Sequence, residues 1–219
     1  SLDNYASKGN GGAIYANFVS NITLVECTFT SNHVDLCGGA VYIDYYRSNI
    51  NPVMSYVMIK GCKFEGNTAG GYENELCNGG AIYIKDAFEL IITACNFKYN
   101  SASNNGQAIF YEENTDSIAN KLLIEDNSFI NNCKKGVTDD KFAISFGIGN
   151  LIVKDCTFDS EISSKLYPII FDTSNIISNV RFENVVCKNT ALLHIPNSDH
   201  SFHYEDFTFS NCDCIDFFV

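Results

Sequence analysis

Two short phrases alternate along the first two thirds of this chain, and their repetition limits the possible fold more than any other feature. The first phrase is a glycine pair followed by alanine, an aliphatic residue and an aromatic residue; it occurs at Gly11–Tyr15, Gly38–Tyr42 and Gly79–Tyr83, and in weaker form at Gly106–Phe110. The second phrase is Cys-x-Phe-x-x-Asn; its copies begin at Cys27, Cys62 and Cys95, and at Asn127, where asparagine replaces cysteine. A period of a few tens of residues built from short β-type phrases predicts a solenoid, because one such repeat buries its apolar face only against its neighbours.

Each repeat contains three short strand patterns separated by bends. One pattern alternates apolar residues two apart, which places them on one face of a strand; the pairs are Ile22 and Leu24, Val57 and Ile59, Leu90 and Ile92, Leu122 and Ile124, and Leu151 and Val153. Polar or small residues such as Lys60-Gly61 then break the alternation, and a strand beginning at the cysteine points Cys and Phe inward. With no helical stretch for a crossover, the pattern predicts an all-β, single-stranded parallel β-helix of about seven coils.

The spacing of the repeat locates insertions on a common frame. Successive core phenylalanines from Phe29 to Phe158 are 35, 33, 32 and 29 residues apart, and the later coils shorten to 25 and then 23 residues from Ala143 to Pro168 to Ala191. A bare coil therefore needs about 23 residues, and the early coils carry extra segments. The main insertions are predicted at Asp44–Tyr56, Thr68–Asn78 and Tyr111–Lys121.

The repeat runs through the chain without a linker, so we expect residues 1–219 to form one domain. Residues 1–10 begin inside a repeat, and Ile215–Val219 ends on an apolar, strand-like run, so we expect a piece of a longer chain. No apolar run of about 18 residues is present, so no membrane-spanning segment is expected.

The net charge of −12 argues against a nucleic-acid partner, because binding a polyanion requires an excess of lysine and arginine.

The repeated asparagines and phenylalanines have structural interpretations. Asn32, Asn67, Asn100 and Asn132 fall at the same turn of successive coils, where stacked amides would form a hydrogen-bonded ladder. The phenylalanines of the same phrase would stack in the interior. The glycine pairs permit a tight bend where the next coil approaches closely.

The 10 cysteines divide into two groups. Cys27, Cys62, Cys95 and Cys156 share one inward position, where parallel side chains hold their Cβ atoms too far apart for disulfides, so buried thiols are predicted. Cys37 and Cys77 each lie just before a Gly-Gly-Ala phrase, in turns of consecutive coils, and a Cys37–Cys77 disulfide is predicted there.

No cofactor and no metal are expected. His194, His200 and His203 lie near one another in the sequence, but their spacing matches no closed zinc pattern. An enzymatic alternative stays open because some parallel β-helices degrade polysaccharides with grouped carboxylates. Asp172, Glu183 and Glu205 are the candidates for such a group, and no catalytic residue is assigned.

The recurring Gly-Gly-Ala-(Ile/Val) and Phe-x-x-Asn phrases resemble the repeat of the chlamydial polymorphic outer membrane proteins and of similar surface proteins in some protozoa. The resemblance covers residues 9–132; beyond it, Glu161 stands where the asparagine would follow Phe158, and the glycine pairs disappear. It implies a right-handed β-helix displayed extracellularly or at a cell surface, often with adhesive function, whose motif residues are structural rather than catalytic.

The function predicted from these observations is a non-enzymatic, adhesin-like scaffold. Binding in solenoids concentrates where insertions gather, and tyrosines on loops suit contact with proteins or sugars. The predicted binding residues are Tyr45, Tyr46, Tyr56 and Tyr72, and the expected partner is a protein or glycan on a host or neighbouring cell. The alternative interpretation is that these rings only cover the exposed edge of the solenoid.

Overall fold

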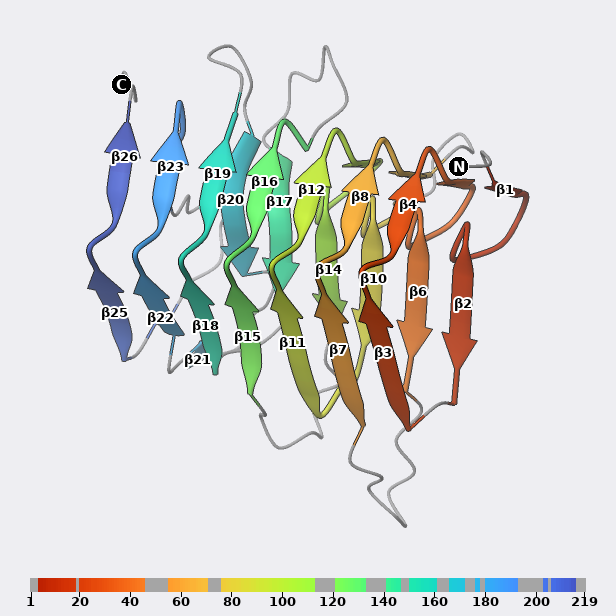
Figure 1. Cartoon of the computed structure of the whole chain (residues 1–219), viewed down its shortest axis with the longest axis horizontal. Coiled ribbons are helices and arrows are strands. Elements are labelled where there is room, and N and C mark those ends of the chain that lie inside the picture. Colours follow the sequence, from red (N-terminus) through yellow and green to blue (C-terminus); the bar gives the residue numbers. More distant parts are fainter. Residues whose placement is uncertain are drawn as a thin grey trace.

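The structure is a computed structural model, and it describes residues 4–18, 20–45, 55–70, 76–112, 121–132, 141–146, 150–160, 166–171, 176–177, 180–192, 203–204 and 206–215. All regular secondary structure in these ranges is β-strand, and all strand pairs are parallel. The chain winds through the same set of sheets in every coil, advancing from β1 and β2 at one end to β25 and β26 at the other (Figure 1). The predicted parallel β-helix is therefore confirmed.

Three long sheets form the walls of the helix. Sheet 1 holds β2 (Ile14–Asn17), β6 (Val41–Asp44), β10 (Ile82–Lys85), β14 (Ile109–Glu112), β17 (Lys141–Phe146) and β20 (Leu166–Phe171). Sheet 2 holds β3 (Asn21–Val25), β7 (Tyr56–Lys60), β11 (Glu89–Thr93), β15 (Leu122–Glu125), β18 (Leu151–Lys154), β22 (Val180–Glu183) and β25 (Phe207–Ser210). Sheet 3 holds β4 (Thr28–Thr30), β8 (Lys63–Glu65), β12 (Asn96–Lys98), β16 (Ser128–Ile130), β19 (Thr157–Asp159), β23 (Val186–Lys188) and β26 (Asp213–Ile215).

Two smaller sheets were not anticipated from the sequence. Sheet 4 holds β1 (Tyr5–Ala6), β5 (His33–Val34), β9 (Thr68–Ala69) and β13 (Ser101–Ala102), and a separate pair joins β21 (Ile176–Ile177) to β24 (His203–Tyr204). Strands of two residues carry no readable alternation, which is why the pattern of the sequence did not show them.

The core follows the predicted inward positions. Phe29, Phe64, Phe97, Phe129 and Phe158 stack in one column with ring centroids 4.7–4.9 Å apart. Cys187 and Cys214 then take the same register position in the last two coils. One apolar cluster extends from Phe29 to Leu192, so the coils share a continuous core.

Bends between sheets depend on residues with left-handed backbone. Glu26, Ala94, Asp126, Asp155, Asn184 and Asn211 occupy equivalent places before the Cys position, all with φ between 51° and 55°, and Gly61 joins them with φ 63°. The two glycines of a pair have different roles. Gly38 has φ 70°, whereas a Cβ on Gly39 would collide with the carbonyl oxygen of Gly80 in the next coil. Only glycine fits either place without strain.

The insertions are shorter than the sequence suggested, because strands cover residues at the ends of the ranges predicted for the insertions. β6 ends at Asp44, and the flanking Tyr45 and Ser55 are both buried. The packed β-helix therefore extends to the residues on both sides of 46–54. Similarly, β9 occupies Thr68–Ala69, and β14 continues to Glu112.

Candidate functional site

The outer face of sheet 1 gathers the aromatic and charged side chains that are most suited to recognition. In β6, Val41 and Ile43 point into the core, so Tyr42 and Asp44 point outward. The strands of sheet 1 are in register, and each outward position therefore forms a row along the axis of the helix. The aromatic row consists of Tyr15, Tyr42, Tyr83 and Phe110, and the polar row consists of Asn17, Asp44, Lys85 and Glu112.

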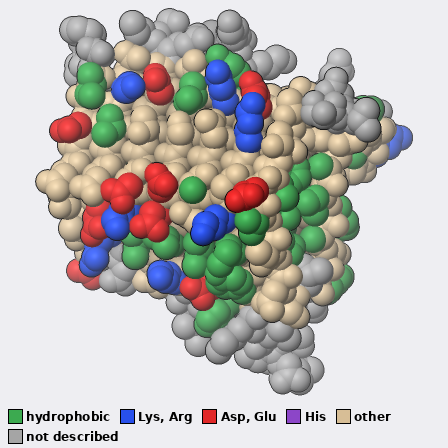
Figure 2. Space-filling model, viewed as in Figure 1, with side chains coloured by type: hydrophobic (Ala, Val, Ile, Leu, Met, Phe, Trp, Pro, Cys, Tyr) green, Lys and Arg blue, Asp and Glu red, His purple; other side chains and the backbone are tan. Residues whose placement is uncertain are grey.

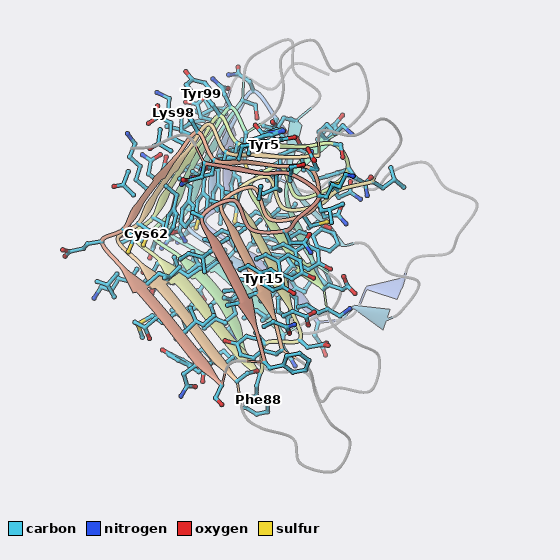
Figure 3. All side chains as sticks on the ribbon, turned by 90° about the vertical axis from the view of Figure 1, so that its right-hand side faces the viewer. Tyr5, Tyr15, Cys62, Phe88, Lys98 and Tyr99 are labelled. Carbon is cyan, nitrogen blue, oxygen red and sulfur yellow. The ribbon has the colours of Figure 1, made fainter. Side chains whose placement is uncertain are left out.

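The rings of the aromatic row stack continuously. Ring centroids are 5.4 Å apart for Tyr15 and Tyr42, 4.8 Å for Tyr42 and Tyr83, and 5.3 Å for Tyr83 and Phe110. Exposure falls along the row: Tyr15 is 55% exposed, Tyr42 is half-buried, and Tyr83 and Phe110 are buried. The accessible end of the row is therefore the pair Tyr15 and Tyr42. Figure 3, which looks along the helix, shows Tyr15 on sheet 1 and Cys62 at the distant corner between sheets 2 and 3.

The polar row alternates in charge and is bonded to the aromatic row. The hydroxyl of Tyr83 donates to a carboxylate oxygen of Glu112, and Lys85 Nζ lies 3.0 Å from the other oxygen. Glu112 thus accepts from a phenol and an ammonium on the neighbouring strand β10. These bonds fix the two outward rows relative to each other, which gives a preorganised surface.

Burial and neighbouring charges shift the pKa values on this face. The pKa of Asp44 is raised, mainly by desolvation, with Glu112 adding to the rise and Lys85 opposing it. Desolvation also raises the pKa of Tyr42 and of Tyr83, and for Tyr83 the hydrogen bond to Glu112 adds to the effect. The hydrogen bond to Glu112 raises the pKa of Lys85. Near neutral pH the phenols are therefore protonated donors, and Lys85 is a cation.

The predicted tyrosines do not form a common surface in the described part of the chain. Tyr45 is 4% exposed and packs in the core, where its hydroxyl donates to the carbonyl oxygen of Tyr56 at 3.5 Å, and burial raises its pKa to about 12. The expectation that Tyr45 is a loop residue facing solvent is corrected, because Tyr45 continues the alternation of β6 and takes the next inward position after Val41 and Ile43. Tyr56 is half-buried at the start of β7 on sheet 2, and Tyr46 and Tyr72 lie outside the described residues.

The outer aromatic row was missed as a site, although the sequence carries its signal. Its members are the fifth residue of each Gly-Gly-Ala phrase, one position after an inward-facing aliphatic residue. Period-two alternation puts that fifth residue on the solvent side.

The asparagines at the turn into sheet 4 form a continuous ladder. Each side-chain amide donates to the Oδ1 atom of the next asparagine, at 2.7 Å from Asn32 to Asn67, 2.9 Å from Asn67 to Asn100 and 2.8 Å from Asn100 to Asn132. Asn4 extends the ladder by one rung, donating to Asn32 at 2.8 Å. Asn67, Asn100 and Asn132 are fully buried, so these positions support the fold rather than a ligand.

The inward cysteines are thiols that hydrogen-bond from coil to coil. The Sγ atom of Cys62 accepts from the Cys27 amide at 3.4 Å, and that of Cys95 accepts from the Cys62 amide at 3.3 Å. Cys156 is also a buried thiol, and desolvation raises its pKa to about 12.

The predicted Cys37–Cys77 disulfide is wrong: the structure holds both residues as thiols. Cys37 is one residue before its glycine pair and Cys77 is two residues before, and Gly38 is in register with Gly79. Cys37 therefore lies beside Asn78, whose amide donates to the Cys37 Sγ at 3.3 Å, while the Cys77 Sγ donates to the Asp35 carbonyl at 3.3 Å. Both side chains pack in one small apolar cluster with Val34, Ala69 and Ala102, but the one-residue offset puts Cys37 beside Asn78 rather than Cys77.

Of the carboxylates proposed for catalysis, the structure describes only Glu183. Glu183 lies on the outer side of β22 and pairs with Arg181 at 3.6 Å, while Asp172 and Glu205 lie outside the described residues, as do His194 and His200. His203 belongs to β24. Among the described residues, no group of three or more His, Cys, Asp or Glu side chains could hold a metal ion.

Fold and surface together define the class of protein: a parallel β-helical solenoid whose outer wall carries stacked aromatic and charged rows. Two stretches of the chain, residues 26–44 and 61–85, match the family model of the Chlamydia polymorphic membrane protein repeat. Both stretches include copies of the phrases identified in the sequence, so the predicted resemblance is confirmed. That repeat family comprises surface-associated proteins of the outer-membrane type and is not an enzyme family.

Searches of curated proteins and of solved structures found no match. Within the described ranges, no helix has the length and apolar character needed to cross a membrane.

Proposed function

We propose that this chain is a non-enzymatic, adhesin-like scaffold at the cell surface or outside the cell, which binds a protein or glycan of a host or neighbouring cell. The polymorphic membrane protein repeat supports surface display. The solenoid supports the role of scaffold, because stacked coils present rows of side chains over a long, rigid face.

The observation that carries the proposal is the exposed end of the aromatic row beside the polar row. Tyr15 and Tyr42 offer ring edges and hydroxyls, and Asp44 and Lys85 offer a hydrogen-bond acceptor and a donor on the same face. A surface that combines aromatic rings with a few fixed polar groups suits both sugars and protein side chains. Because Asp44 is followed directly by Tyr45 and the insertion at residues 46–54, the predicted loop and this face are adjacent in the chain.

The first experiment tests the face. The double variant Tyr15→Ser and Tyr42→Ser should reduce binding to a glycan array or to cultured host cells at least tenfold, because it removes the accessible rings. Thr28→Ser and Thr30→Ser, on the outer side of β4 in the same end of the helix, provide the matched control. Unchanged saturable binding by the tyrosine variant would contradict the assignment of this face.

The second experiment tests the insertion. Replacing residues 46–54 with a short Gly-Ser turn, while keeping Tyr45 and Ser55, should leave the thermal unfolding transition nearly unchanged, because the replaced segment lies between the buried ends of the frame. Binding should fall if Tyr46 and its neighbours contribute contacts. Binding retained in both this variant and the tyrosine variant would overturn the proposed function.

An enzyme that degrades polysaccharides is the second candidate, favoured by one arrangement on sheet 1. Asp44 and Glu112 lie in register on β6 and β14, on either side of β10, so their backbones are about 9.6 Å apart at two strand spacings. Two carboxyl groups that flank a glycosidic bond can act as general acid and base in its hydrolysis. Turnover of acidic or neutral polysaccharides that is lost in Asp44→Asn or Glu112→Gln would replace the scaffold proposal; binding without turnover would support it.

A further inference from the structure

The outer face of sheet 2 carries an aliphatic stripe that the proposed function does not use. Met58, Ile91, Leu123 and Ile152 occupy the same outward register position on β7, β11, β15 and β18. All four side chains are half-buried, although they point away from the core. In Figure 2, hydrophobic side chains gather on the lower half of the visible face, over these strands. Contiguous apolar side chains on an outer sheet face mark an interaction surface.

Polar and charged residues border the stripe, two residues before and two residues after it in each strand. Before the stripe, Glu89 of β11 lies beside Lys121. After the stripe, Lys60, Thr93, Glu125 and Lys154 follow one another on β7, β11, β15 and β18. Figure 2 shows the charged groups along these margins, with the apolar side chains between them.

We propose that this stripe is the interface between two copies of the chain, packed face to face about a twofold axis parallel to the helix. This symmetry places each strand of sheet 2 against the same strand of the second copy, running in the opposite direction. The apolar positions then meet one another, and each residue before the stripe faces the residue after it in the second copy. A twofold interface is self-complementary, as this pattern requires.

Charge complementarity favours a second copy as the occupant. In β15 and the residue preceding it, Lys121 faces Glu125 of the second copy, and the symmetry makes this contact twice. In β7, the ring of Tyr56 faces Lys60 of the second copy, a cation–π geometry. Arg181 occupies the stripe position itself on β22, in register with Ile152, so the apolar part of the stripe ends at β18. Its charge is compensated within the same chain by Glu183 at 3.6 Å. An anionic membrane or nucleic acid is a poorer occupant for a chain of net charge −12.

The area of the outer face of sheet 2 determines how tightly two copies are expected to associate. Seven strands spaced by about 4.8 Å and four to five residues long give a face of about 34 by 15 Å, or roughly 510 Å² per copy. A standard interface buries about 800 Å² per partner, so the dimer should be weak and concentration-dependent. Such an interface leaves the outer face of sheet 1 accessible, because that face lies on a different wall of the helix.

The experiment measures the oligomeric state by sedimentation velocity from low-micromolar to high-micromolar protein. The wild-type chain should shift from monomer towards dimer with rising concentration. Leu123→Lys, at the centre of the stripe, should weaken association at least tenfold. The matched control is Ile130→Lys, which adds the same charge on the outward side of β16 in the same coil and should leave association unchanged. Circular dichroism melting verifies that both variants are folded.

Charge reversal tests the orientation and remains informative if Leu123→Lys fails to fold. Lys121→Glu and Glu125→Lys should each weaken the dimer, and the double variant should restore it, because the two partners exchange places. A monomer at all concentrations would overturn the proposal. Association that survives Leu123→Lys in folded protein would also overturn it, and would locate self-association on another surface. Failure of the double variant to restore the dimer would overturn the proposed packing. Glycan or cell binding by a strictly monomeric chain leaves the proposed function standing, so the two proposals fail separately.

Discussion

Asn127 occupies the position that cysteine holds in neighbouring coils, and its contacts show what that position requires. Its Oδ1 accepts from the Cys95 amide at 2.8 Å, and its Nδ2 donates to the Ile92 carbonyl at 2.9 Å. The thiol of Cys95 makes the same two kinds of contact, accepting from the Cys62 amide and donating to the Ile59 carbonyl at 3.6 Å. The inward cysteines therefore act as weak polar links between coils as well as small apolar side chains.

Phe97→Ala is expected to lower the free energy of unfolding by about 3–5 kcal/mol, because it leaves a cavity in the stacked column. Phe97 is fully buried between Phe64 and Phe129, with both ring centroids at 4.9 Å. Chemical denaturation of the variant measures the change. Tyr15→Ala, at the exposed end of the outer row, is the control, and equal losses at the two positions would contradict the assignment of faces.

At the scale of elements, short strands are held in place by the bends between them. The bend before each Cys position uses one residue with left-handed backbone, and in most coils that residue is not glycine. A left-handed residue with a side chain costs about 1–2 kcal/mol, which Asn and Asp reduce by local hydrogen bonds. Ala94, with φ 54°, has no such compensation.

Ala94→Gly should therefore raise the stability by about 0.5–1 kcal/mol, since relief of strain exceeds the extra entropy of glycine in the unfolded chain. Gly61 already occupies the equivalent place one coil earlier. Ala143→Gly, inside β17, is the matched control and should lower the stability. Thermal unfolding compares the two, and destabilisation by both variants would show that Ala94 is not strained.

The first short strand is tied to the second coil by a carboxylate. Asp35 accepts from the Tyr5 hydroxyl at 2.9 Å and from the Lys8 amide at 2.9 Å. Its pKa is lowered chiefly by the Lys8 hydrogen bond, with the Tyr5 hydroxyl adding to the effect and desolvation opposing it. Since the pKa is lower in the folded state, the resulting stabilisation is complete above the ordinary aspartate pKa, about 3.9, and is lost as the pH falls through the folded value.

We expect the hydrogen-exchange protection of the Lys8 amide to be constant near neutral pH and to fall below about pH 4, as Asp35 protonates. The Asp35→Asn variant should show weaker protection without that pH dependence. Protection in the wild type that persists to about pH 2 would contradict the role of the carboxylate.

At the scale of the whole molecule, the stabilising contacts repeat from coil to coil along the helix. The interior phenylalanine column, the asparagine ladder and the thiol links each extend over several coils in register. Each coil therefore buries its neighbours, and no single coil has a core of its own.

Far-ultraviolet circular dichroism of the whole chain should show mostly strand and little helix, because the described residues form strands and bends. A spectrum with a third or more helix would contradict the β-helix for the chain in solution.

The sequence alone determined the solenoid, its inward phenylalanines and aliphatic pairs, and the positions of its main bends. These follow from period-two alternation and from residues such as Phe97 and Asn67 that recur at fixed places, and both are properties of local sequence. Only the tertiary structure decided the register between coils. Register places Cys37 beside Asn78 rather than Cys77, and aligns Tyr15 with Tyr42 and Met58 with Ile91 as rows on the outer walls. A shift of one residue reverses the face of every side chain, and loops of variable length hide that shift from the sequence.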